Sequence, residues 1–373
     1  MSTTDSSPTS SPSESPLNSP RALSPTLTLV EPTSFILPDL VSHCRFPLIY
    51  HPAGDILAKR SLNWILSHVP HLSPRKTAAL HELKAGELTA FCYHNCPPER
   101  LRVVMDFMNY LFHLDNISDG MMAADAEGLA NWVMNAFEWP EEFKPLPGQR
   151  GDAEEISAAK LARDYWSRCI VDCPPAVQAR FKSSMQMFFQ AVQQQARDRA
   201  NGVIPDLESY IDVRRDTSGC KPVFDLIEYS HGFALPDEVV EHPLIVALNQ
   251  SANDLVTWSN DVFSYNVEQA RGDTHNMICI LMSHDGLTLQ EAIDRVGQLC
   301  MQTIDNFIED KDCLPSWGPE VDAHVRLYVY GLQEWISGSL HWSFQTRRYF
   351  GDSGAVVKAT RFVNLLPLQE KRL

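Results

Sequence analysis

Apolar residues recur at spacings of three and four along most of this chain, and this pattern constrains its fold more than any other feature. Such spacing places apolar side chains on one face of an α-helix, whereas no segment shows the convincing alternation of a half-buried strand. Proline and glycine separate the helical stretches, for example at Pro97 and Pro98 and again at Gly318 and Pro319. We therefore predict an all-α protein with helices over residues 101–114, 157–170, 176–200, 237–270, 288–310 and 320–346.

Length and composition predict one helical domain with a tail at each end. The chain has 373 residues, and an all-helical protein of this size can form around one large core. Residues 1–33 are rich in Ser, Pro and Thr and contain no aromatic residue, so they bury too little surface to offset the entropy lost on ordering. We predict a disordered tail over residues 1–33, a helical domain over 34–360 and a C-terminal tail over 361–373.

Charge and cysteine content restrict the partners. The net charge of −16 disfavours a nucleic-acid partner, because phosphate contacts there depend on clustered Lys and Arg. The nine cysteines are scattered through helical segments, as expected of reduced intracellular thiols. No stretch approaches the ~20 apolar residues that span a membrane, and residues 1–33 lack the apolar core of a secretory signal. We expect a soluble, cytoplasmic protein that is a monomer or a homodimer.

Three oxygen-bearing side chains share one face of a predicted helix. Asn260, Ser264 and Glu268 are each four residues apart, so they point in a similar direction. An amide oxygen, a hydroxyl and a carboxylate form a hard ligand set that suits Mg²⁺ better than zinc or copper. The alternative is a polar helix face in water, although Asn and Ser are indifferent helix formers and would gain little there.

A second acidic face follows the apolar helix predicted over residues 101–114. Asp115 and Asp119 are four residues apart and could bridge divalent ions at the rim of a cavity. The alternative is an ordinary helix end that runs into a polar turn before Gly120. Together with the first face, this pair suggests a protein that gathers several divalent ions around an anionic group such as diphosphate.

A third element is a predicted break in a helix. Gly219 and Pro222 interrupt a pattern that would otherwise run over residues 210–229, and a broken helix leaves carbonyl oxygens without amide partners. Those carbonyls would be available to a ligand. Arg214 and Arg215 precede the break, and the sequence does not decide which of them faces the ligand. The alternative is an exposed arginine pair at a helix kink.

In this order, the motifs resemble those of the class I terpene synthases, specifically the fungal sesquiterpene cyclases. Residues 115–119 are similar to the aspartate-rich motif of that family, and the helix face at residues 260–268 is similar to its Asn/Ser/Glu motif. Residues 214–219 resemble its diphosphate-sensing stretch, and Arg348 with Tyr349 resembles its late Arg-Tyr pair. The resemblance spans roughly residues 35–360. Asn116 departs from the family pattern, since many relatives carry a carboxylate there.

The resemblance implies an all-α class I terpenoid synthase bundle around a central apolar cavity. It implies that Mg²⁺, three ions in all, is held by Asp115 and Asp119 on one side and by Asn260, Ser264 and Glu268 on the other. It also implies that Arg214, Arg348 and Tyr349 bind the diphosphate of a prenyl substrate. The candidate aromatic residues for the cavity wall, each of which could equally be ordinary core packing, are Phe91, Phe107, Phe112, Phe189, Trp258 and Trp335.

By the same resemblance, the substrate is farnesyl diphosphate, which is ionised and cyclised to a sesquiterpene hydrocarbon. A 1,11 closure through a humulyl cation, as in protoilludene formation, is one route that would fit. A chain-elongating prenyltransferase is the nearest alternative, but it would be expected to carry two aspartate-rich motifs. A catalytically silent helical scaffold is the other alternative, and it predicts no stabilisation by Mg²⁺ and diphosphate.

Overall fold

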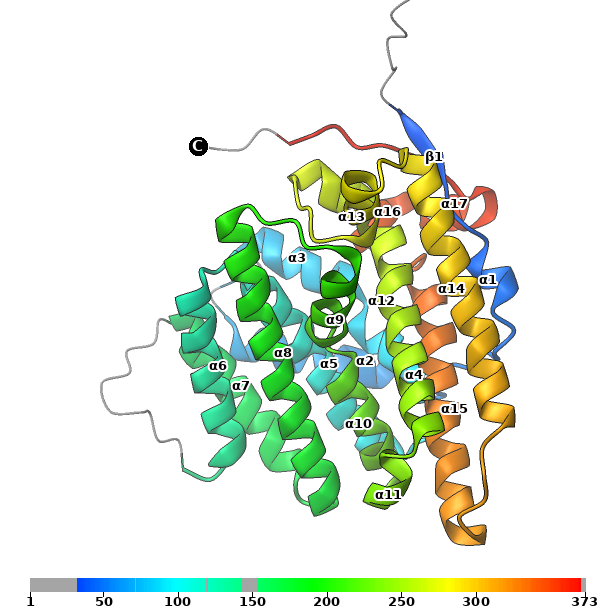
Figure 1. Cartoon of the computed structure of the whole chain (residues 1–373). Helices are drawn as coiled ribbons and strands as arrows, with labels where there is room; N and C mark the ends of the chain where they lie inside the picture. The colour runs from blue at the N-terminus through cyan, green and yellow to red at the C-terminus, as the bar shows by residue number, and fades with distance from the viewer. Residues whose placement is uncertain (1–31, 71, 119, 143–152, 370–373) are drawn as a thin grey trace, which may run out of the picture. The chain divides into compact units, whose positions relative to one another are not determined.

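Helices form nearly all of the regular structure, as predicted from the sequence. The computed structural model describes residues 32–70, 72–118, 120–142 and 153–369. Most of the tail predicted over residues 1–33 lies outside these ranges, and so does Asp119. The described helices belong to one compact unit that begins at Thr33 (Figure 1). None of the helices described is long and apolar enough to cross a membrane.

Most of the helices follow one another along the chain with short connections. They are α1 (Leu40–His43), α2 (Gly54–His68), α3 (Pro74–Leu83), α4 (Ala85–Cys92), α5 (Pro98–Ser118), α6 (Ala123–Glu138), α7 (Ala153–Cys169), α8 (Pro175–Asn201), α9 (Leu207–Thr217), α10 (Cys220–His231), α11 (Asp237–Val240), α12 (Pro243–Arg271), α13 (Met277–His284), α14 (Leu289–Asp312), α15 (Pro319–Trp342), α16 (Arg347–Phe350) and α17 (Gly354–Thr360). A short 3-10 turn, η1 (Gly351–Ser353), joins the last two.

Proline and glycine set the ends of the long helix α12. The single helix predicted over residues 237–270 is in fact two, because α11 ends at Val240 and Pro243 opens α12. Proline fits this first position, since its missing N–H has no helical partner there. Gly272 ends α12 with a φ of 76°, a left-handed conformation that glycine adopts without steric cost. The result is one uninterrupted helix of 29 residues that carries the Asn/Ser/Glu face.

Helix α12 contacts several other helices and so brings distant parts of the chain together. It lies against α14 and α15, and also touches α9, α10, α13 and α16. Helix α15 in turn contacts α4 and α10, and α5 contacts α2, α4, α7 and α10. Figure 1 shows α14 and α15 running alongside α12. These contacts bring the end of α5, the junction of α9 and α10, the middle of α12 and the short α16 to one region.

The helix break predicted near residue 219 is confirmed. Helix α9 ends at Thr217 and α10 begins at Cys220. Gly219 makes the break, with a φ of 69°, and Pro222 lies inside the first turn of α10 rather than at the interruption itself. A Cβ on Gly219 would come within 2.8 Å of Leu111 Cδ2, so the break also depends on a close approach to α5.

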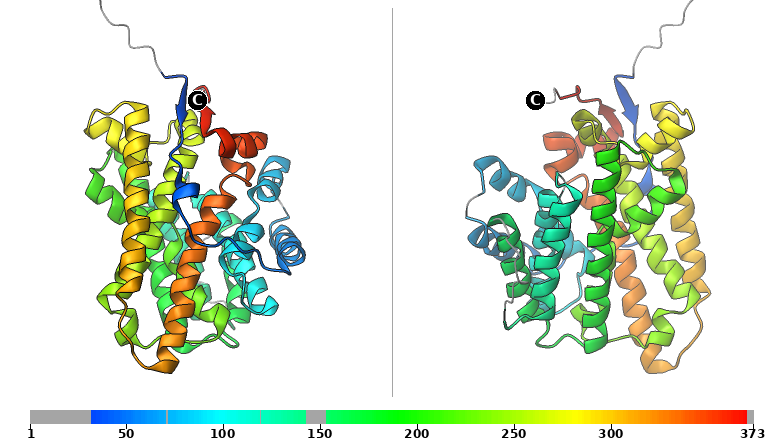
Figure 2. Two further views of the ribbon diagram at one scale, coloured as in Figure 1. Left: turned by 90° about the vertical axis from the view of Figure 1, so that its right-hand side faces the viewer. Right: turned by 60° about the vertical axis from the view of Figure 1, so that its left-hand side comes forward.

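Two short strands were not predicted from the sequence, and neither were the helices α2, α3, α4, α6 and α13. Strand β1 (Ser34–Ile36) pairs antiparallel with β2 (Phe362–Asn364), with Phe35 opposite Val363 and both side chains buried. Both views of Figure 2 place the blue start of the described chain beside its red end. The segment expected as a C-terminal tail from residue 361 thus contributes a strand to the domain. Each strand has three residues, which is too short for alternation to be recognised.

Candidate functional site

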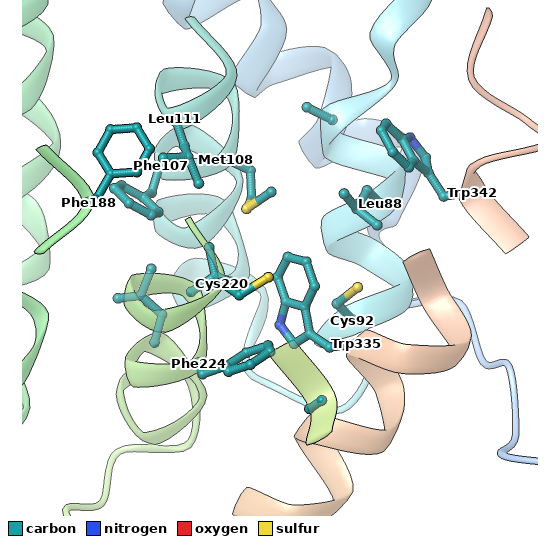
Figure 3. Packing of buried hydrophobic residues seen from close by; sticks show 14 of the residues in the cluster. Leu88, Cys92, Phe107, Met108, Leu111, Phe188, Cys220, Phe224, Trp335 and Trp342 are labelled. Atoms are coloured by element: carbon teal, nitrogen blue, oxygen red, sulfur yellow. The ribbon is translucent and has the colours of Figure 1, made fainter. Parts of the chain in front are cut away.

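One cavity collects most of the residues that the sequence singled out. Its wall has an apolar part and a charged part. The apolar part is formed by Leu88, Met108, Leu111, Phe112, Phe188, Val223, Trp335 and Trp342. The polar part includes Asp115, Arg214, Asn260, Glu268, Arg348 and Tyr349. Figure 3 shows how apolar side chains from α4, α5, α8, α10 and α15 face one another around this region.

The aromatic part of the wall differs from the candidates taken from the sequence. Phe112 and Trp335 line the cavity, as do Phe188 and Trp342, which had not been named. Phe107 instead packs against Phe181, with ring centroids 5.0 Å apart, in a fully buried aromatic cluster. Phe91, Phe189 and Trp258 are likewise absent from the lining. Helical spacing alone does not distinguish a side chain that faces a cavity from one that faces a neighbouring helix.

Asn260 is the middle member of a hydrogen-bonded row of three side chains, Arg214, Asn260 and Tyr349, which come from three different helices. Its Oδ1 accepts a 2.8 Å hydrogen bond from Arg214 Nη2 on α9, and its Nδ2 donates a 2.6 Å hydrogen bond to Tyr349 Oη on α16. Tyr349 is buried, and this burial raises its pKa to about 12, so the phenol stays protonated at neutral pH. Three segments that the sequence predicted separately therefore meet through direct side-chain contacts.

The next residue, Asp261, fixes Arg214 in place. Asp261 is buried and accepts hydrogen bonds from Arg214 Nε at 3.1 Å and Nη2 at 2.9 Å. Tyr210 Oη and the backbone amide of Met277 donate to its other carboxylate oxygen. Burial is the largest single effect and would lower the pKa of Arg214, but the nearby Asp261, Tyr210 and Glu268 together outweigh it and the pKa is raised. The guanidinium therefore keeps its positive charge beside the cavity.

The two neighbouring arginines face different parts of the protein. Arg214 lines the cavity together with Asn260, whereas Arg215 pairs with Asp254 through two hydrogen bonds of 2.7 Å. Arg215 lines a second, separate polar cavity between α8, α9, α10 and α12. Adjacent residues on a helix point about 100° apart, and the packing of α9 on α12 decides which one faces the cavity.

The charged part of the cavity also includes the start of the aspartate-rich segment. Asp115, near the end of α5, accepts a 3.3 Å hydrogen bond from Arg348 Nη2 on α16. Arg348 also lies over the ring of Phe112, 5.8 Å from its centroid. Asn116 is exposed and is not part of the lining. Asp119, predicted as a second carboxylate of this segment, lies outside the described residues.

The face formed by Asn260, Ser264 and Glu268 fits a hard divalent cation. The Ser264 hydroxyl is buried beside Glu268 and helps to stabilise its charged form, yet no hydrogen bond of regular geometry reaches its Oγ within the described part of the chain. Burial, with the nearby Asp261 charge, raises the pKa of Glu268 to about 7 despite a 2.9 Å hydrogen bond from Asn276 Nδ2. A cation at this face would satisfy the hydroxyl and favour the ionised carboxylate.

Several polar residues of the cavity were missed from the sequence. Gln195 comes from α8 and Thr257 from α12, and a cluster after the Asn/Ser/Glu face contributes Arg271, Asp273 and His275. Burial, and then the charge of Arg214, lowers the pKa of His275 to about 3, so its ring is neutral. The signal that could have revealed the cluster is Gly272, because a turn there directs the following polar residues back towards the helix end.

Comparison with known proteins places this geometry in a family. Residues 106–306 match the family model described as terpene synthase family 2, C-terminal metal binding. The chain belongs to the terpene synthase family. The match covers α5 to α14 almost completely and therefore includes both predicted metal faces and the break between α9 and α10. The resemblance noted in the motifs, and the all-α fold expected from it, are confirmed.

Related fungal proteins align over most of the terpene synthase chain. The α-muurolene synthase of Coprinopsis cinerea is 64% identical over 92% of this chain and 80% of its own length. Sesquiterpene synthase Agr3 of Cyclocybe aegerita is 62% identical over 91% of this chain and 96% of its own. Among solved structures, germacradien-4-ol synthase from Streptomyces citricolor has a TM-score of 0.68 at 24% identity, covering 80% of this chain and 96% of its own. At that identity the structural likeness supports the fold alone.

Proposed function

We propose that this terpene synthase is a Mg²⁺-dependent sesquiterpene synthase that ionises farnesyl diphosphate, releases diphosphate and cyclises the farnesyl cation to a hydrocarbon. One observation carries the proposal most strongly. The hydrogen-bonded row of Arg214, Asn260 and Tyr349 borders a cavity whose other wall is apolar and aromatic. A polar end for an anionic leaving group beside an apolar chamber for a hydrocarbon chain is the arrangement that this reaction requires.

The substrate class is supported by the curated relatives. Two fungal proteins that match nine-tenths of this chain at more than 60% identity are named α-muurolene synthase and sesquiterpene synthase. We therefore infer a C15 prenyl diphosphate as substrate. The 1,11 closure expected from the motif resemblance remains one of the routes that product analysis would distinguish.

The proposed metal ligands form two groups, of which Asp115, Asn260 and Glu268 line the cavity. We propose that Asp115, with Asp119, acts on the α5 side, and that Asn260, Ser264 and Glu268 act on the α12 side, for three Mg²⁺ ions in total. When bound, such ions stabilise the negative charge that develops on the departing diphosphate. The fit rests on the donor set, which is made of carboxylate, amide and hydroxyl oxygens, and on the buried Ser264 hydroxyl described above.

The remaining polar residues would bind the diphosphate directly. Arg214 is the proposed sensor, because it lines the cavity whereas Arg215 is held by Asp254. Arg348 can donate several hydrogen bonds from its guanidinium, and the Tyr349 hydroxyl can add one more. A carbonyl at the break, near Ser218 or Gly219, is proposed to help trigger ionisation by stabilising the positive charge that forms on the substrate.

The apolar wall has a separate task. Phe112, Trp335 and Trp342 present aromatic surfaces to the cavity, and aromatic faces stabilise a passing carbocation without reacting with it. The same surfaces exclude water, which would otherwise trap the cation as an alcohol. Product identity then depends on the shape of this wall.

The test is incubation of the purified protein with farnesyl diphosphate, with and without Mg²⁺, followed by gas chromatography and mass spectrometry of the volatile products. We expect a cyclic C15 hydrocarbon that appears only when Mg²⁺ is present. The same assay with geranyl and geranylgeranyl diphosphates defines the chain length. Elongated prenyl diphosphates formed when isopentenyl diphosphate is added would instead identify a prenyltransferase, and no product from any substrate would contradict an enzymatic role.

A further inference from the structure

Asn253 is a buried polar residue on the same stripe of α12 as the proposed metal ligands. It lies seven residues before Asn260, or about two helical turns, and its side chain is 2% exposed. It does not line the cavity that holds Asn260. An amide buried in this way needs partners for both its oxygen and its nitrogen, and Asn253 finds them at the break between α9 and α10.

Both ends of the Asn253 amide are used at this break. Its Nδ2 donates a 2.9 Å hydrogen bond to the carbonyl oxygen of Arg215. Its Oδ1 lies 3.1 Å from the hydroxyl of Ser218, whose one hydrogen can donate to it or to the same Arg215 carbonyl, 3.0 Å away. The Ser218 hydroxyl also accepts a 3.1 Å hydrogen bond from the amide of Cys220, the first residue of α10. Asn253 therefore contacts the last turn of α9 and the residue that starts the break.

The local backbone explains why the orientation of Ser218 matters. In a continuous helix, the carbonyl of residue 218 would accept a hydrogen bond from the amide of residue 222. Residue 222 is a proline and has no N–H to donate. The Ser218 carbonyl is thus released from the helical pattern by sequence, while the Ser218 hydroxyl lies against both Asn253 Oδ1 and the Arg215 carbonyl to which Asn253 donates.

Contacts other than those of Asn253 also attach α9 to α12. Two ion pairs already join these helices, one between Arg214 and Asp261 at 2.9 Å and one between Arg215 and Asp254 at 2.7 Å. Asn253 adds its hydrogen bonds beyond the last of these anchors, at the point where the chain leaves the helix. Its contacts therefore define the geometry of the break rather than the docking of α9.

We propose that Asn253 is a positioning residue that orients the break at Ser218 and Gly219 relative to the metal-binding face of α12. The inference rests on the proposed function, because the break acts only if its carbonyl assists ionisation. Asn253 and Asn260 belong to the same helix. The hydrogen bonds of Asn253 therefore fix the position of the triggering carbonyl relative to the proposed metal ligands. A displacement of about 1 Å at such a point can lower a rate on the order of 100-fold.

The experiment measures kcat and KM for farnesyl diphosphate in Asn253→Ala and in the isosteric Asn253→Asp, which keeps the size but removes the donor to Arg215. For both variants we expect kcat to fall by about 10-fold to 100-fold with KM changed by less than about threefold. The stabilisation by Mg²⁺ plus inorganic diphosphate should remain, because no proposed ligand is altered. Combining Asn253→Ala with Ser218→Ala should give a smaller loss than the two single losses added together.

Asn249→Ala is the matched control. Asn249 lies one turn earlier on α12 and also donates a side-chain hydrogen bond, 2.6 Å to Tyr328 Oη, but away from the break. We expect its kcat to stay within about twofold of the wild-type value. A kcat in Asn253→Ala no lower than in Asn249→Ala would overturn the positioning role, and so would a parallel loss of Mg²⁺-diphosphate stabilisation. A wild-type protein without Mg²⁺-dependent turnover would overturn the proposed function and this role with it.

Discussion

Asn260 donates a 2.6 Å hydrogen bond to Tyr349 Oη across 89 residues of sequence. The oxygen of the same amide accepts from Arg214, so the atom proposed as a metal ligand is held by the proposed diphosphate sensor in this structure. One rearrangement of Arg214 would therefore expose a ligand oxygen and turn the guanidinium towards an anion at the same time. The geometry thus joins the proposed metal ligand and the proposed diphosphate sensor through a single side chain.

Replacement of the proposed metal ligands on α12 should abolish turnover and leave the fold intact. We expect no detectable hydrocarbon from Asn260→Ala or Glu268→Ala, with far-ultraviolet circular dichroism like that of the wild type. Asn116→Ala should be much milder, because Asn116 is exposed and does not line the cavity. Equal losses of turnover at Asn116 and Asn260 would contradict this ranking of the residues.

Mg²⁺ and inorganic diphosphate together should stabilise the folded protein. A ligand pair that binds only the folded state at about 100 times its dissociation constant contributes about 2.7 kcal/mol, which is measurable as a rise in Tm by differential scanning fluorimetry. Each component alone should give a smaller rise. A silent scaffold with merely solvated acidic faces would show no rise at millimolar concentrations.

Arg214 and Arg215 should differ in that same assay. Arg214→Lys removes the bidentate geometry at the cavity, because a lysine ammonium cannot reproduce the planar fork of the guanidinium. We expect it to lose most of the stabilisation by Mg²⁺ and diphosphate. Arg215→Lys retains a cation beside Asp254 and should keep the stabilisation. The opposite pattern would assign the sensor to Arg215.

Tyr349→Phe tests the hydroxyl at the end of the hydrogen-bonded row. The variant leaves Asn260 Nδ2 without this acceptor, which should cost about 0.5–1.5 kcal/mol of stability. We also expect kcat/KM to fall about 10-fold, since a hydrogen bond proposed for the diphosphate is lost. Chemical denaturation and steady-state kinetics measure the two effects separately. Unchanged kinetics with reduced stability would limit Tyr349 to a structural role.

Asp225→Asn should stabilise the protein above neutral pH. Burial raises the pKa of Asp225 from 3.8 to about 7, although Ser184 Oγ donates a 2.6 Å hydrogen bond to its carboxylate. Between these two values the folded state binds a proton that the unfolded state releases, so wild-type stability falls as the pH rises from about 4 to 7. The amide carries no such penalty. Urea denaturation should show the variant about 1–3 kcal/mol more stable at pH 8 and close to the wild type at pH 4.

The sequence predicted the faces of the site but not its contacts. Asn260, Ser264 and Glu268 could be found because the helical period alone places them together. The choice between Arg214 and Arg215 could not, because it depends on how α9 is rotated against α12. The break at Gly219 followed from its residue type, whereas the hydrogen bonds of Asn253 to that break join residues 35 and 38 positions apart. A buried Asn within an apolar helix was the available signal for it.

The predicted bounds were accurate for the longest amphipathic helices, such as α8 and α14, whereas α2 and α6, with 15 and 16 residues, were not predicted. The fold was also predicted less well at short elements, since α16 has four residues and gives no periodicity to read. Yet α16 supplies both Arg348 and Tyr349. These two proposed diphosphate-binding residues thus lie on a helix that packs against α3 and α12. Its position follows from this packing and could not be predicted from its own sequence pattern.

The pairing of β1 with β2 has a consequence for synthesis on the ribosome. The partner of Phe35 is Val363, so β1 cannot pair until nearly the whole chain has been synthesised. Arg348 and Tyr349 emerge shortly before that strand, and the cavity lacks them until then. Because chains emerge N-terminus first, a nascent or truncated chain without these last segments would hold most of the apolar chamber without the groups that complete its polar end.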